Sequence, residues 1–295
     1  MTASFVDPPG GPATNGPAAL VKGGGELGTA VALALWRAGW RVVVAELPRP
    51  TVLRRQLSLA EAAFCGAVTR DGVRARRVAA PAEAVVLLRV PQSLPLYVGP
   101  LPELLRSWRP ALVVDARMRR GVAPERQRHE APLVVGLGPE LVAGRDVDWV
   151  IETCPGPDLG RVIGVGAARP HAPLPRGAGS AAEEYVRAPH AGLWRTDRAI
   201  GDEVAAGERL GWLDAASLRA PVAGCLRGLV HDGVTVPAGA KLVAVHPGDW
   251  RRKESGIGQR AAAVAASVLQ LAATRAAQHG AAPPGLAVAL PAAAT

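Results

Sequence analysis

The residues best suited to bind a ligand lie in one stretch near the N-terminus. Gly23, Gly25 and Gly28 fit the pattern G-x-G-x-x-G, and the acidic Glu46 follows about 20 residues later. Glycines at this spacing let backbone N–H groups approach a phosphate, and an acid at that distance can hold the hydroxyls of a ribose. The stretch therefore predicts a site for NAD(P) or another nucleotide or dinucleotide, with a merely tight structural turn as the alternative.

Glu26 places a carboxylate inside this turn. A negative charge there repels a pyrophosphate unless it caps the helix or faces a hydroxyl. We keep Glu26 among the cofactor-binding candidates and leave the identity of the ligand open.

The elements around the turn follow from the hydrophobic pattern. A short apolar strand at residues 20–22 precedes the glycines, and apolar residues recur at helical spacing from residue 27 to residue 38. Gly39 is placed to end this helix, and the β-branched run at residues 42–44 predicts a strand buried on both faces. Together they predict a β-α-β unit with the Gly-rich turn at its first bend.

Composition bounds the remaining possibilities. The chain has 295 residues, 49% hydrophobic and 4% aromatic, with a net charge of +9. The arginines are scattered and not interleaved with aromatics, so we expect no nucleic-acid partner. We expect no membrane span and no secretory signal, because no apolar run is long enough and residues 1–17 lack a basic region followed by an apolar one.

Cysteine usage points to a reducing compartment. Cys65, Cys154 and Cys225 are far apart and form no C-x-x-C. They are typical of buried thiols in the cytoplasm rather than of disulfides, and we expect no metal site.

Further apolar runs extend the predicted sheet. Residues 84–90, 111–115, 133–136 and 148–152 are expected to be strands, residues 102–108 a helix, and residues 67–75 a hairpin turning at Asp71 and Gly72. Ser58 and Glu61 fit a capping box of a short helix. The fold class is therefore α/β with a Rossmann-like, mostly parallel sheet.

An internal repeat follows the sheet. The segment around Pro189 resembles that around Pro221, and Gly207 and Leu210 recur at the same offset as Gly239 and Leu242. Two such halves resemble the barrel-sandwich hybrid of biotinyl and lipoyl carrier domains, which place a modified lysine on the hairpin between the halves. Here that hairpin, residues 212–217, contains no lysine. We therefore expect neither biotin nor lipoate.

These patterns divide the chain into six parts. We expect a disordered tail (1–17), a Rossmann-like nucleotide-binding domain (18–170), a linker (171–182), a barrel-sandwich hybrid domain (183–248), a C-terminal helix (249–279) and a second disordered tail (280–295). The helix can pack on the sheet or against another subunit, so a homo-oligomer is possible.

A series of motifs also occurs in a fixed order along residues 20–247. It comprises residues 23–28, 37–39, 46, 50, 54–55, 61–62, 114–116, 136–139, 143–147, 150–153, 158–163 and 226–230. The series resembles the YqeB family, which is named as an accessory of the selenium-dependent molybdenum hydroxylase system. The chain departs from the family pattern at residues 117–121, 138–141 and 155–157, where a histidine is lost.

The resemblance implies a role in maturing or inserting the cofactor of a molybdenum hydroxylase of the xanthine dehydrogenase type. The hydroxylase, or its cofactor-insertion machinery, is then the partner. Around the Gly-rich turn we place Glu46 on a ribose, Arg54 and Arg55 on a phosphate or carboxylate, Asp115 as the acid–base candidate, and Arg161. The alternative for the two neighbouring arginines is a solvated surface with ion pairs to Glu61.

Two other function classes stay open. An NAD(P)-dependent oxidoreductase needs a proton donor near the nicotinamide, usually His, Tyr or Lys. No such residue sits close to a predicted strand end in the sheet domain, and Tyr97 and His129 are the only nearby candidates. A scaffold that binds a partner without chemistry needs no such group.

Overall fold

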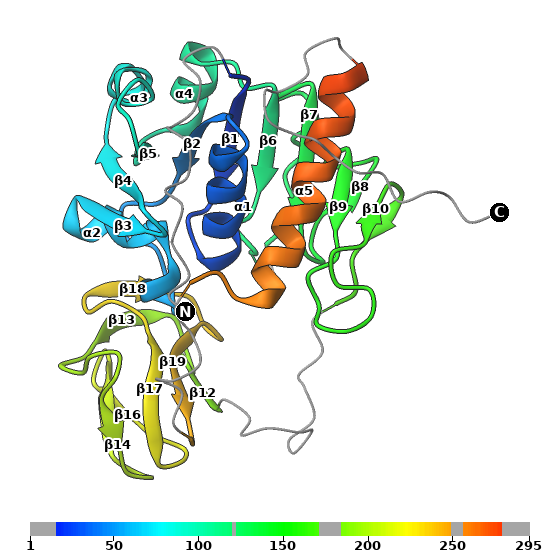
Figure 1. Cartoon of the computed structure of the whole chain (residues 1–295). Coiled ribbons are helices and arrows are strands. Elements are labelled where there is room, and N and C mark those ends of the chain that lie inside the picture. The colour runs from blue at the N-terminus through cyan, green and yellow to red at the C-terminus, as the bar shows by residue number, and fades with distance from the viewer. Residues whose placement is uncertain (1–15, 120–121, 171–183, 249–255, 279–295) are drawn as a thin grey trace, which may run out of the picture.

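The computed structural model describes residues 16–119, 122–170, 184–248 and 256–278 (Figure 1). Its largest sheet has nine strands in the order β10-β9-β7-β6-β1-β2-β5-β4-β3, all parallel except the two edge strands β10 and β3. The strands are β1 (Ala18–Lys22), β2 (Arg41–Ala45), β3 (Ala67–Arg70), β4 (Val73–Val78), β5 (Ser93–Tyr97), β6 (Leu112–Asp115), β7 (Leu133–Leu137), β9 (Trp149–Ile151) and β10 (Val162–Ile163). A separate small antiparallel pair joins β8 (Val142–Ala143) to β11 (Gly166–Ala167).

Helices cover both faces of this sheet (Figure 1). Helices α1 (Glu26–Arg37) and α5 (Gln259–Gln278) pack side by side on one face, and α3 (Pro81–Leu87) and α4 (Leu101–Ser107) cover the other. The connection from β2 to β3 contains two short 3-10 turns, η1 (Arg55–Leu57) and η2 (Leu59–Glu61), and the single-turn α2 (Ala62–Cys65). Within the described residues, no helix combines the length and the apolar character that a membrane crossing needs.

The strand order reverses at the centre of the sheet. Strand β1 pairs in parallel with β2 on one side and with β6 on the other. In open α/β sheets, ligands bind outside the carboxyl ends of the strands at this point. The predicted β-α-β unit is confirmed, and Gly39 ends α1 in a left-handed conformation with φ of +85°.

Two predictions for the sheet region were wrong. Residues 84–90 do not form a strand, because Pro81 and the Glu83 carboxylate, which accepts the Ala79 and Ala80 N–H groups, start α3 just before them. The strand at this position is β5, and Pro95 is tolerated there because β2 pairs only with Leu96 and Tyr97.

The predicted capping box is also wrong. The Ser58 hydroxyl donates to the Arg54 carbonyl at 2.7 Å instead of capping a helix. The Glu61 carboxylate contacts Arg55 and His231 instead of the backbone of Ser58.

Two four-stranded antiparallel sheets follow, packed over a common apolar core. Their orders are β12-β19-β17-β14 and β16-β15-β13-β18. In the repeat, strands β12, β13, β14 and β15 correspond to β16, β17, β18 and β19. Replacing each strand in one order by its counterpart gives the other order, so the two halves are intertwined as predicted. The strands are β12 (Glu184–Arg187), β13 (Gly192–Arg195), β14 (Glu203–Val204), β15 (Arg209–Leu213), β16 (Ala216–Arg219), β17 (Gly224–Leu229), β18 (Val234–Val236) and β19 (Lys241–His246).

This β unit lies beside the carboxyl edge of the large sheet (Figure 1). Leu229 N–H donates to the Leu53 carbonyl at 2.8 Å, and the rings of Phe64 and His231 stack with centroids 3.9 Å apart. The segment that follows β2 therefore carries the contact between the two parts.

The absence of a biotinyl or lipoyl group remains a prediction. The β15–β16 hairpin turns at Asp214 and Ala215 and offers no amine. Lys241 lies on β19, with its ammonium 3.3 Å from the centre of the Tyr185 ring. Intact mass of the chain from its native host should show no adduct, and an added biotinyl or lipoyl mass would overturn this expectation.

Several of the predicted domain boundaries lie in segments that the structure does not describe. The tail at 1–15, the linker at 171–182, and residues 249–255 and 280–295 lie outside the described residues. Gly16 and Pro17, placed in the disordered tail, are described, and their carbonyls accept hydrogen bonds from Arg41.

Candidate functional site

Three of the four glycines in the turn are required by the fold itself. Gly23 has φ of +94°, and a Cβ on it would meet the Arg117 backbone at 3.1 Å. A Cβ on Gly24 would lie 3.0 Å from the Ala60 nitrogen, and one on Gly28 would lie 1.9 Å from the Gly23 carbonyl oxygen. These three positions are explained by packing and backbone conformation alone.

Gly25 differs from its neighbours. Its φ is −66°, which any residue adopts, and a Cβ built on it would meet no atom of the described residues within 4 Å. Gly25 is also the N-cap of α1, and no side chain in the described ranges caps this helix end. The turn therefore leaves the positive end of α1 open, which fits a phosphate group of a nucleotide.

Glu46 holds the turn in this shape. One carboxylate oxygen accepts the Gly24 N–H at 2.7 Å, and the other accepts the Leu47 N–H at 2.8 Å. Burial raises the pKa of Glu46, and the two hydrogen bonds oppose that rise. A carboxylate has about four acceptor positions, so Glu46 can still accept a ribose hydroxyl.

The segment after β2 packs against the turn from outside. The Thr29 hydroxyl donates to the Gly24 carbonyl at 3.0 Å and accepts the Leu59 N–H at 2.9 Å. Ala60 N–H donates to the same Gly24 carbonyl at 2.9 Å. These bonds fix the turn before any ligand arrives, which lowers the ordering cost of binding.

The predicted arginines separate in the structure. The Arg54 Nε lies 4.0 Å from a Glu26 carboxylate oxygen, so Arg54 is beside the turn. Arg55 instead donates from Nε to the Leu229 carbonyl at 2.7 Å and lies 3.5 Å from Glu61. Arg161 is exposed just before β10, four strands from β1 in the sheet order, and the structure does not bring it to the turn.

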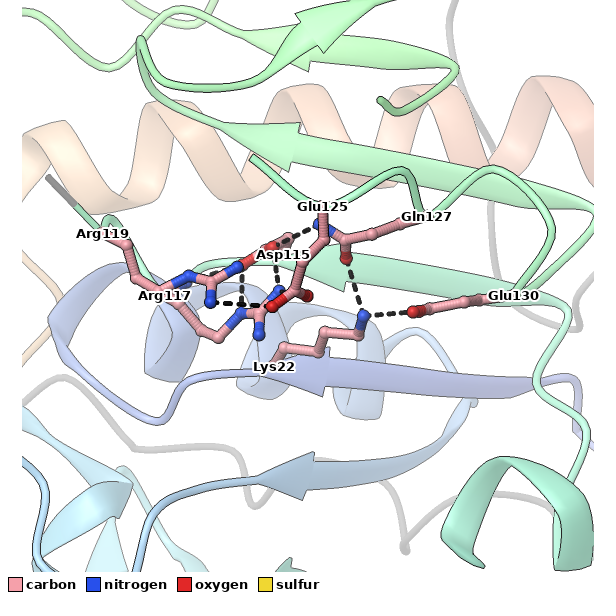
Figure 2. A network of polar contacts seen from close by, with 7 residues as sticks. All are labelled: Lys22, Asp115, Arg117, Arg119, Glu125, Gln127 and Glu130. Atoms are coloured by element: carbon pink, nitrogen blue, oxygen red, sulfur yellow. Dashed lines mark hydrogen bonds and ion pairs between the residues drawn. The ribbon is translucent and has the colours of Figure 1, made fainter. Parts of the chain in front are cut away.

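Asp115 lies at the carboxyl end of β6 in a buried polar network (Figure 2). Arg117 donates to both of its carboxylate oxygens, at 2.9 and 2.6 Å, and the Gln127 amide donates at 2.7 Å. Burial acts to raise the pKa of Asp115, but the bonds from Arg117 and Gln127 outweigh it and lower the pKa below its usual range. Asp115 is thus ionised at neutral pH and cannot donate a proton, and a role as a base stays a prediction.

Lys22 extends the network at the end of β1. Its ammonium donates to the Gln127 side-chain oxygen at 2.6 Å and lies 2.5 Å from a Glu130 carboxylate oxygen (Figure 2). Burial lowers the pKa of Lys22, which Glu130 partly offsets. The network fastens the long β6–β7 connection to the strand that leads into the Gly-rich turn.

One arginine near the turn was missed in the sequence. Arg260, at the start of α5, donates from Nε to the Thr153 carbonyl at 2.7 Å. Burial lowers the pKa of Arg260, and the negative charge of the nearby Glu26 opposes that shift. A Cβ on Gly258 would also lie 3.8 Å from Glu26, so α1 and α5 begin beside each other. No local pattern links residues so far apart, so only the fold reveals this neighbour.

No metal centre emerges from the described part of the chain, where no three potential His, Cys, Asp or Glu ligands cluster. Cys65, Cys154 and Cys225 are all free thiols there.

The fold defines a class of protein: a mixed α/β chain with a large, mostly parallel sheet and separate antiparallel sheets. Over 252 residues the chain is 34% identical to "Uncharacterized protein YqeB" of Escherichia coli (strain K12), a match that covers 85% of this chain. It covers 46% of YqeB, so the chain spans about half the length of that relative. The similarity supports the YqeB resemblance, and the name of this relative carries no function.

Two other comparisons add little. No protein-family model matches the chain. A solved structure described as "Structure and function of a single-chain, multi-domain long-chain acyl-CoA carboxylase" covers 38% of this chain and 10% of its own, at 23% identity and a TM-score of 0.20. A TM-score of this size does not indicate a shared fold.

Proposed function

We propose that this chain is an accessory protein for the maturation of a molybdenum hydroxylase of the xanthine dehydrogenase type. In this role it binds a nucleotide or dinucleotide through the Gly-rich turn. The assignment to a molybdenum hydroxylase is supported by the family resemblance, and the assignment of a nucleotide ligand is supported by the geometry of the turn.

The main support for a nucleotide ligand is the presence of a glycine at position 25. The fold explains Gly23, Gly24 and Gly28, but neither the backbone conformation nor packing within the part of the chain that the structure describes requires a glycine at position 25. The close approach of a ligand phosphate does require one. Glu46 would then hold the ribose, Arg54 the anionic part, and the bound nucleotide would supply any redox or group-transfer chemistry.

We propose that the two intertwined four-stranded sheets form a barrel-sandwich hybrid that presents a surface to the hydroxylase or its cofactor-insertion machinery in the cytoplasm. The hairpin turn without lysine supports a binding role rather than a carrier role.

The geometry favours an accessory over an NAD(P)-dependent oxidoreductase. Asp115 is held as an ion pair, and the buried Tyr97 hydroxyl donates to the Pro100 carbonyl at 3.2 Å. Neither is placed as a proton donor next to the turn. An assay for NAD(P)H oxidation separates the two functions, and binding of the hydroxylase by a variant that cannot bind nucleotide would favour a pure scaffold.

Arg54 and Arg55 offer a matched pair for testing the accessory role. If Arg54 binds a phosphate, Arg54→Ala should remove a charge-assisted hydrogen bond of about 1.5–3 kcal/mol. A native-host strain carrying it should make a folded hydroxylase with reduced activity and cofactor content.

Arg55→Ala is the control. It removes the bond to the Leu229 carbonyl, so it should lower the stability of this chain by about 1–3 kcal/mol without a specific loss of hydroxylase cofactor at permissive temperature. Full hydroxylase activity with Arg54→Ala would leave the proposed anion site without support.

A further inference from the structure

A buried hydroxyl lies without a hydrogen-bond partner beyond the carboxyl end of β9, next to the edge strand β10. The Thr153 side chain, two residues after β9, is fully buried, and its Oγ1 has no partner among the described residues. A buried hydroxyl that forms no hydrogen bond destabilises a fold by about 1–3 kcal/mol. Such a group in a native structure points to a partner that binds from outside.

The surroundings of this hydroxyl are strained. A Cβ built on Gly138, which has φ of +86°, would lie 3.4 Å from Thr153 Oγ1 and 3.0 Å from the Sδ and Cε atoms of Met118. The Thr153 hydroxyl and the end of the Met118 side chain therefore converge on one point over Gly138. Met118 itself has φ of +50°, in the left-handed region. Strained backbone of this kind collects at ligand sites.

A pocket adjoins this point. Its lining includes the apolar residues Met118, Leu137 and Pro139 and the charged residues Asp115, Arg119 and Glu140. Leu137 and Pro139 flank Gly138 in the chain, and Met118 both lines the pocket and lies beside Gly138, whereas Thr153 is not part of the lining. Methionine is flexible enough to move aside at little cost.

The same point lies next to the Gly-rich turn. The Arg117 backbone, which packs on Gly23, directly precedes Met118, and the Thr153 carbonyl binds Arg260 beside Glu26. Met118 and Thr153 are therefore both next to residues that border the Gly-rich turn.

We propose a second ligand subsite over Gly138, covered by Met118, in which Thr153 Oγ1 hydrogen-bonds the far end of the ligand. The apolar residues Met118, Leu137 and Pro139, together with the buried hydroxyl, suit a flat heteroaromatic ring with one hydrogen-bonding edge. This proposal rests on the proposed nucleotide function and specifies that the ligand is a dinucleotide with a ring at its distal end.

Thr153→Val tests the subsite, with Thr153→Ser as the matched control that keeps the hydroxyl. The probes are NAD⁺, FAD and their shared half ADP, titrated by calorimetry against the full chain. Wild type should bind one dinucleotide more tightly than ADP. Thr153→Val should lower the affinity for that dinucleotide about tenfold and leave the affinity for ADP within about twofold of wild type. It should keep or raise the melting temperature, because an isosteric apolar group replaces an unpaired hydroxyl.

Met118→Ala provides a second variant. It removes the cover without touching the turn, so dinucleotide affinity should rise severalfold while ADP affinity stays unchanged. Weaker dinucleotide binding would contradict the assignment of Met118 as a displaceable cover.

The outcomes separate this inference from the function on which it rests. ADP binding as tight as dinucleotide binding, or unchanged dinucleotide affinity in Thr153→Val, would overturn the subsite while the turn still binds a nucleotide. A lower melting temperature in Thr153→Val would show that the hydroxyl serves the fold, and it would also overturn the subsite. If wild type binds none of the three probes, the subsite and the nucleotide proposal both fail.

Discussion

Lys22→Met should lower the free energy of unfolding by about 3–5 kcal/mol, because it removes one partner of a buried ion pair. The Lys22 ammonium is the common partner of the Glu130 carboxylate and the Gln127 side-chain oxygen, and the Lys22 side chain is 2% exposed. Without it, a largely buried negative charge and a buried acceptor are left unpaired. Chemical denaturation of the two proteins measures the difference.

Two further variants test the cause of that loss. Lys22→Met combined with Glu130→Leu removes both charges and should recover much of the stability, because an apolar pair can replace a buried ion pair. Arg119→Met breaks only the more exposed contact with Glu125 and should cost less than about 1 kcal/mol. A loss below about 1 kcal/mol for Lys22→Met alone would show that the network does not fasten the β6–β7 connection.

Gly25→Val should reduce nucleotide affinity by at least about 100-fold while the protein stays folded. The added Cβ meets no atom within 4 Å among the residues that the structure describes, and the backbone conformation allows it. The side chain fills the space over the start of α1 that a phosphate would occupy. The cost to stability should be about 1 kcal/mol, because valine is a poor N-cap.

Gly28→Ala is the contrasting variant. Its Cβ would lie 1.9 Å from the Gly23 carbonyl oxygen, so the helix cannot keep its place on β1. We expect this smaller substitution to unfold or strongly destabilise the large sheet, as circular dichroism would show. Equal thermal stability of the two variants would contradict the division between fold-required and ligand-required glycines.

The sequence predicts those parts of the fold that local patterns encode. The β-α-β unit around the turn, the β3–β4 hairpin at Asp71 and Gly72, and helix α4 all follow from periodicity and turn residues within a few positions. The internal repeat likewise predicts two intertwined halves, because the same offset relates their glycines and leucines.

Other features depend on competing local signals for helix and strand, or on contacts between residues far apart in the chain. Residues 84–88 are apolar enough for a buried strand, and only the start signals at Pro81 and Glu83 decide for a helix. The partners of Lys22, the proximity of Arg260 to Glu26, and the unpaired Thr153 hydroxyl arise between segments far apart in the chain. Periodicity and spacing contain no information on such contacts.

Binding of a nucleotide at the Gly-rich turn is the central claim, and calorimetric titration of folded wild type and Gly25→Val with NAD⁺, FAD and ADP tests it most directly. The account predicts saturable binding of at least one of these by wild type and its loss in the folded variant. Equal affinity in the two proteins would contradict it.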